Sequence, residues 1–168
     1  MNKTFLRIVL WLAVITWMGL IFYFSAQNAS DSAELSGQTV RKLVEFFVKD
    51  FKDMPDHAQY SMVKNLEHMV RKTAHMAVFF VLGTLVTSAL LQHTVKKRFW
   101  TALLICTLYA VSDEVHQLFV EGRGAQIEDV FIDSLGALAG ICLVLMINSL
   151  GFIKMRTTEI ILLIKKHL

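Results

Sequence analysis

The chain has 168 residues, of which 55% are hydrophobic and 18% are charged, and its formal net charge at pH 7 is +3. The length allows one domain, but a mean hydropathy of +0.51 exceeds that of a soluble globular domain. The composition therefore excludes an ordinary soluble domain. It indicates an integral membrane protein whose partner is membrane lipid and not nucleic acid. Both cysteines fall inside apolar runs, so no disulfide framework is expected.

Four apolar runs are long enough to cross a bilayer core of about 30 Å as helices. They cover residues of about 5–24, 73–91, 99–118 and 130–150. The first run is longer and richer in aromatic residues than the hydrophobic region of a signal peptide, so we expect it to be retained. We predict a single all-α membrane domain over residues 1–168, built as a bundle of four transmembrane helices.

A polar segment, residues 25–71, separates the first two apolar runs. Within it, apolar residues between positions 33 and 51 recur near helical spacing with charges between them, which predicts an amphipathic helix. Such a helix lies on the membrane surface or on the bundle. The sequence Asp53–Asp56 contains the single proline and is expected to end this helix, and another begins at about residue 58. The tail, residues 154–168, is too short to span and is predicted to be interfacial.

The ratio of basic to acidic residues differs between the two sides of this predicted bundle. Nine Lys and Arg accompany one acid on the side of the termini, whereas eight accompany thirteen acids on the other side. The positive-inside rule therefore places both termini and the loop of residues 96–98 in the cytoplasm. The segment 25–71 and the loop 120–126 are then extracytoplasmic.

Ionisable residues are concentrated in the third and fourth predicted spans, where they are costly and therefore indicate a functional site. They are Asp113, Glu114 and His116 in the third span and Asp133 in the fourth. Helical spacing places Asp113 on one face with His116 and Gln117. These side chains lie near the ends of the spans that we expect to face outward.

The second and fourth spans also carry polar residues at the same end. The second begins with Arg71, Lys72 and His75, and the fourth carries a stripe of Asp129, Asp133, Gly136 and Gly140. The two glycines allow a neighbouring helix to approach closely. We therefore predict one outward-facing polar pocket built from the second, third and fourth spans, with Arg123 of the short loop above it.

A salt-bridge network and a metal site are two open interpretations of this pocket. In the first, three cations, Arg71, Lys72 and Arg123, neutralise carboxylates in a salt-bridge network that holds the bundle together. Six acids face these three cations, and an unpaired buried carboxylate must be protonated, bind a cation or meet water. In the second, an oxygen-rich site binds a divalent metal. Its candidate ligands are Asp113, Glu114, His116 and Asp129, together with His75.

An enzymatic interpretation uses the same residues. His75 or His116 acts as general acid or base, oriented by Asp113 or Asp129. The three cations clamp an anionic group such as a lipid phosphate. The remaining predicted substrate-binding residues are Glu114, Gln117 and Asp133. A transporter is disfavoured because the fourth span has no ionisable residue beyond Asp133 to carry protons onward.

The order of these motifs resembles the VanZ-like membrane protein family. The motifs are RKxxH at residues 71–75, sDExhQ at 112–117, gR at 122–123 and Dv…D…G at 129–136, and the resemblance runs from Ser25 to about Leu150. It implies a multi-pass protein of the bacterial cytoplasmic membrane. The founding member of the family is linked to low-level teicoplanin resistance, and its molecular activity is not established.

The resemblance implies a cell-envelope protein that binds or modifies a lipid-linked surface component. The component would be a cell-wall precursor or a glycopeptide, and the phenotype would be tolerance to teicoplanin-type antibiotics. The alternative is a non-catalytic binding or structural protein whose charged cluster is a salt-bridge network. The resemblance does not separate an enzyme from a binding protein.

Overall fold

The computed structural model describes the backbone of residues 2–27 and 29–167, and the side chains of residues 2–27 and 37–151. These residues form helices and no strand, so the all-α prediction is confirmed. The helices are α1 (Lys3–Ser25), α2 (Ala29–Phe47), the short 3-10 helix η1 (Phe51–Asp53), α3 (Asp56–Leu91), α4 (Arg98–Gln117) and α5 (Ile127–His167).

Three of the described helices are long and apolar enough to cross a membrane. They are α1, α3 and the Ile127–Gly151 part of α5. The third predicted span is present as the 20-residue α4, but it is not among these three. Its last two turns contain Asp113, Glu114 and His116, which lower its hydropathy.

Two predicted boundaries are wrong because helices continue through them. The second predicted span is only the C-terminal half of α3, which has 36 residues and includes the helix expected to begin at about residue 58. No Gly or Pro lies between residues 58 and 82, so nothing ends the helix there. Likewise α5 continues for 41 residues and includes most of the predicted interfacial tail.

The predicted amphipathic helix is present as α2, but its bounds of 33 and 51 are wrong. The helix begins at Ala29 and ends at Phe47, and η1 follows after a turn. The reason is the side chain of Phe51, which is fully buried in a small core with Val40 and Val44. To bring Phe51 to that core, which also packs against the N-terminal half of α3, the chain leaves the helical path.

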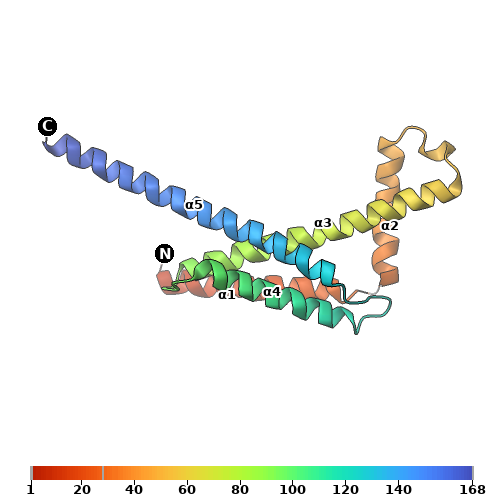
Figure 1. Cartoon of the computed structure of the whole chain (residues 1–168), viewed down its shortest axis with the longest axis horizontal. Coiled ribbons are helices and arrows are strands. Elements are labelled where there is room, and N and C mark those ends of the chain that lie inside the picture. Colours follow the sequence, from red (N-terminus) through yellow and green to blue (C-terminus); the bar gives the residue numbers. More distant parts are fainter. Residues whose placement is uncertain (1, 28, 168) are drawn as a thin grey trace.

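The helices run back and forth along one bundle (Figure 1). α1 and α4 run in one direction, and α3 and α5 run in the other. Consequently the end of α1, the end of α4 and the beginning of α5 lie at one end of the bundle, where α3 passes them. α2 lies across the N-terminal half of α3 beyond that end (Figure 1).

α3 and α5 cross with their backbones in contact. A Cβ atom added to Gly136 would collide with the carbonyl oxygen of Met76, and one added to Gly140 would collide with that of Phe80. Gly83 of α3 meets the backbone of α5 in the same way. The predicted close approach at the small-residue stripe is therefore confirmed, because only a residue without a side chain fits at these contacts.

Candidate functional site

Three ionisable side chains from three helices meet at the end of the bundle where α1 and α4 finish. His75 of α3, Asp113 of α4 and Asp133 of α5 each offer one atom, and these atoms lie within 4.8 Å of one another. Asp113 is 1% exposed and Asp133 is 0% exposed. His75 Nδ1 lies 3.8 Å from Asp133 Oδ1, which is too long for a hydrogen bond. We call these three residues the His-Asp-Asp cluster.

The helix crossing explains why the cluster forms. Asp133 lies about one turn before Gly136 on α5, and Gly136 touches the backbone of Met76, the residue after His75. The absence of a side chain at Gly136 thus brings Asp133 beside His75. Asp113 comes from the last turns of α4, on the face that the other helices bury.

One oxygen of Asp113 is held firmly by neighbours. Ser25 Oγ, at the end of α1, donates a hydrogen bond of 2.8 Å to Asp113 Oδ2. Gln117 Nε2, one turn later on α4, donates to the same oxygen at 3.3 Å. These two donors fix the orientation of the carboxylate, and its other oxygen remains available.

Four other side-chain polar atoms of the cluster are buried and have no hydrogen-bond partner among the described residues. They are Asp113 Oδ1, both carboxylate oxygens of Asp133, and His75 Nδ1. Among the residues whose side chains the structure describes, no Lys or Arg forms an ion pair with Asp113 or Asp133. A buried carboxylate without a partner costs several kcal/mol, roughly 2–7 even for a neutral polar group. The cluster is therefore a site that calls for a neutralising ligand or proton.

The predicted salt-bridge network forms only at the margin of this site. Lys72 Nζ lies 3.2 Å from Glu128 and 3.8 Å from Asp129. The Glu128 side chain is 80% exposed, so that ion pair contributes little to stability. Lys72 therefore does not neutralise the buried cluster.

Three predicted ligands of a metal lie outside the cluster. Glu114 is buried, but its oxygens accept hydrogen bonds from the backbone N–H of Gln126 at 2.8 Å and from Gln117 Nε2 at 3.1 Å. It thereby ties the loop before α5 to α4. The ring of His116 stacks on Phe22 of α1 with centroids 3.9 Å apart. Asp129 lies beside Lys72.

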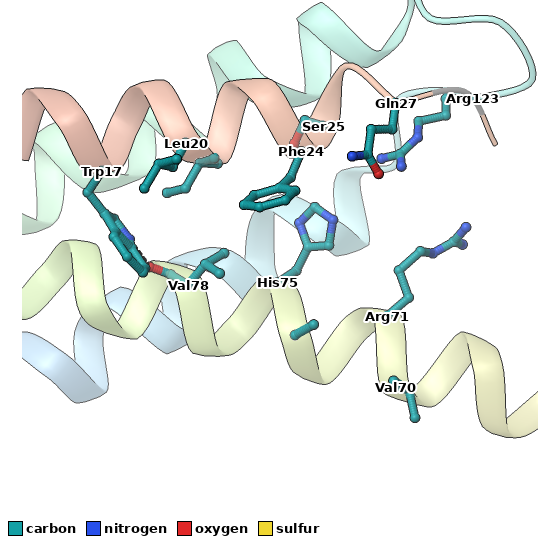
Figure 2. Close-up of a pocket in the computed structure, with 12 residues that line it drawn as sticks. Trp17, Leu20, Phe24, Ser25, Gln27, Val70, Arg71, His75, Val78 and Arg123 are labelled. Carbon is teal, nitrogen blue, oxygen red and sulfur yellow. Dashed lines mark hydrogen bonds between the residues drawn. The ribbon is translucent and has the colours of Figure 1, made fainter. Parts of the chain in front are cut away.

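A cleft of about 380 Å³ lies between α1 and α3 next to the cluster. Its walls are mainly apolar and include Trp17, Leu20, Ile21, Phe24 and Val78. Its polar lining residues are Ser25, Gln27, Arg71, His75 and Arg123. Figure 2 shows Trp17 and Val78 toward one end, His75 in the middle, and the two arginines toward the other end. The cleft thus changes from apolar to cationic along its length.

The cationic end of the cleft has two guanidinium groups and no paired carboxylate. Among the described residues, neither Arg71 nor Arg123 forms an ion pair. Gly122 has a positive φ of 74°, a conformation that favours glycine, and this turn presents Arg123 to the cleft. Burial, and then the neighbouring charge of Arg71, lower the pKa of the Arg123 guanidinium. An anion between the two guanidiniums would relieve their repulsion.

Sequence analysis missed the contribution of α1. The predicted pocket used the second, third and fourth spans, whereas α1 supplies one wall of the cleft and, through Ser25, a hydrogen bond to the cluster. The only sequence signal was Ser25, where the resemblance to the family begins. Periodicity alone does not show which helix an aromatic face will contact.

A bundle of long apolar helices with a buried ionisable cluster and a cationic cleft at one end defines a helical membrane protein with a polar site. The family model described as VanZ/LLP1 matches residues 10–148, which is most of the chain. The chain therefore belongs to the VanZ/LLP1 family, and the resemblance seen in the sequence motifs is confirmed. No curated protein and no solved structure matches the chain.

Proposed function

We propose that this VanZ-like cell-envelope protein binds a lipid-linked phosphate of the outer membrane leaflet in the cleft between α1 and α3. The observation that carries the proposal is the composition of the cleft, which is apolar along α1 and ends at two arginines that have no carboxylate partner among the described residues. Hydrocarbon and phosphate require these two environments side by side. A volume of about 380 Å³ is within the range of small-molecule sites.

The apolar walls and the cationic end of the cleft bind different portions of the lipid-linked phosphate. The aromatic and aliphatic side chains of α1 contact the lipid chain next to the phosphate. Arg71 of α3 and Arg123 of the loop before α5 both lie toward one end of the cleft (Figure 2). In this proposal their guanidiniums bind one phosphate from these two elements. Charge-assisted hydrogen bonds from arginine to phosphate are about twice as strong as neutral ones.

The proposed topology gives the cleft access to the outer leaflet. With α4 crossing as a fourth span, both termini lie in the cytoplasm of a bacterium and the cationic end of the cleft faces outward. The balance of basic residues supports this orientation, since the short loop Lys96–Arg98 has three cations and no acid. Lipid-linked cell-wall precursors are present in that leaflet. Binding them there would change their accessibility to teicoplanin-type glycopeptides, which is the proposed physiological effect.

The first test measures binding of a polyprenyl phosphate to the protein in lipid nanodiscs, in EDTA. We expect Arg71→Gln and Arg123→Gln each to weaken binding about tenfold, equivalent to about 1.4 kcal/mol. The matched control is Arg41→Gln on α2, where Arg41 pairs with Glu45 at 3.3 Å and does not line the cleft.

Two outcomes contradict the proposal. One is equal affinity of the wild type and both cleft variants. The other is equal affinity of the wild type for the uncharged polyprenol and its phosphate. In cells, expression of the wild type should raise the inhibitory concentration of teicoplanin, and Arg71→Gln at equal abundance should not.

A further inference from the structure

We infer that the His-Asp-Asp cluster binds one divalent cation, with open coordination positions toward the cleft. The ligands would be His75 Nδ1, Asp113 Oδ1 and an oxygen of Asp133. This set differs from the ligands predicted from the sequence, of which only Asp113 and His75 remain. The cation site itself is independent of the proposed function, and only the role of the open positions rests on it.

The spacing of the three ligand atoms fits one ion. Divalent metals bind nitrogen and oxygen at about 2.0–2.6 Å, so two ligands of one ion lie no more than about 4–5 Å apart. The three atoms lie within 4.8 Å of one another, and His75 Nδ1 is 3.8 Å from Asp133 Oδ1. That separation is too long for a hydrogen bond but is ordinary for two atoms that bind the same ion.

Burial without partners is an independent observation that points to a ligand. Asp133 is fully buried, and neither of its oxygens has a hydrogen-bond partner in the described part of the chain. The free oxygen of Asp113 and the Nδ1 of His75 are also buried without a partner. A cation between them would satisfy these atoms at once.

The surroundings of Asp113 resemble those of a metal ligand. Ser25 and Gln117 both donate to Oδ2, which leaves Oδ1 for the cluster. Hydrogen bonds of this kind orient ligating carboxylates in metal sites. A donor set of one imidazole and two carboxylates suits Mn²⁺, Zn²⁺ or Fe²⁺ better than a thiolate-selecting metal.

Three protein ligands leave coordination positions open, as in catalytic zinc sites. Of the cluster, His75 lines the cleft, as does Ser25, which donates to Asp113, so the open positions would lie on that side. If the proposed function holds, a phosphate oxygen occupies an open position while Arg71 and Arg123 contact the other oxygens. The alternative occupant is a proton, shared between a charged His75 and the two carboxylates.

The test is metal binding by the purified full-length chain, without lipid phosphate. EDTA-treated protein is equilibrated separately with Mn²⁺, Zn²⁺, Mg²⁺ and, without oxygen, Fe²⁺, then desalted and analysed for bound metal. We expect about one ion per chain with at least one metal, and at least tenfold weaker binding by Asp133→Asn, Asp113→Asn and His75→Gln. The controls are Glu128→Gln and His68→Gln, a carboxylate and an imidazole outside the cluster.

Thermal unfolding gives a second readout, which separates loss of the metal site from a variant that fails to fold. Metal should raise the Tm of the wild type and leave that of Asp133→Asn unchanged. In EDTA, Asp133→Asn should be at least as stable as the wild type, since an amide needs no neutralising charge. Wild type that holds none of the four metals, or cluster variants that bind like the wild type, would overturn the inference.

The two proposals fail in different ways. A wild type that binds no metal, but binds lipid phosphate in EDTA in a manner that depends on Arg71, would overturn only the cation site. Intact metal stoichiometry without any binding of lipid phosphate would overturn only the proposed function.

Discussion

Asp113 lies where side chains from three other helices meet. Its Oδ2 accepts a hydrogen bond from Ser25 of α1, and one of its carboxylate oxygens lies within 4.8 Å of a ligand atom of His75 of α3 and of Asp133 of α5. A single residue at the end of α4 thus links the elements that form the site. The orientation of its carboxylate determines whether the other ligand atoms can share one ion.

At this scale we expect Ser25→Ala to lower the free energy of unfolding by about 1.5–3 kcal/mol in EDTA, because the variant loses a buried hydrogen bond to a carboxylate. The measurement is denaturant titration in mixed micelles. The control is Ser149→Ala, since the Ser149 hydroxyl donates only to the carbonyl of Met146 in its own helix. Equal losses in both variants would show that the Ser25 bond has no special weight.

At the residue scale, the predicted face of α4 is only partly present in the structure. Helical spacing placed Asp113, His116 and Gln117 on one face, and Gln117 does contact Asp113. His116 instead stacks on Phe22, because α1 packs against α4 and offers an aromatic ring at that height. A residue three positions away is rotated by about 60° on the helix, which is enough to turn it toward a different neighbour.

The site depends on the contact between helices α3 and α5. Three glycines, Gly83, Gly136 and Gly140, let the two backbones touch. The crossing places Asp133 beside His75. Neither the glycines of α5 nor the ionisable residues predict that pairing by themselves. The spacing of the glycines predicted where α5 makes a close helix contact, but it did not predict that α3 is the partner helix.

We expect Gly140→Ala to destabilise the bundle by about 1–3 kcal/mol, because the new Cβ collides with the backbone at Phe80 and Thr84. The measurement is denaturant titration of Gly140→Ala beside a control, Gly151→Ala. Gly151→Ala in the same helix meets nothing within 4 Å and should be neutral or slightly stabilising. A Gly140→Ala variant as stable as Gly151→Ala would contradict the close crossing.

The residues of the candidate site lie together at one end of the bundle. Ser25, His75, Asp113, Asp133 and Arg123 come from segments far apart in sequence, and the back-and-forth course of the helices brings them together (Figure 1). α4 must run the full length of the bundle for this arrangement. At 20 residues it is about 30 Å long, which matches a bilayer core.

The four-span topology predicts opposite sides for the two short loops. In a chain with Cys106→Ala and Cys142→Ala, Glu121→Cys should react with a membrane-impermeant maleimide in intact spheroplasts. Lys96→Cys should react only after lysis, because its loop carries the cations that remain in the cytoplasm. Labelling of both positions from the same side would show that α4 does not cross the membrane.

The sequence by itself determined the fold class, the approximate positions of the long helices and the set of ionisable residues at one end of the bundle. Hydropathy and helical periodicity are local properties, so they can be read along the chain. Only the tertiary structure decided which of these residues meet: His75 with Asp113 and Asp133, and α1 with α3 around the cleft. That choice depends on how helices pack against one another, which is set by glycine contacts and aromatic surfaces from distant segments.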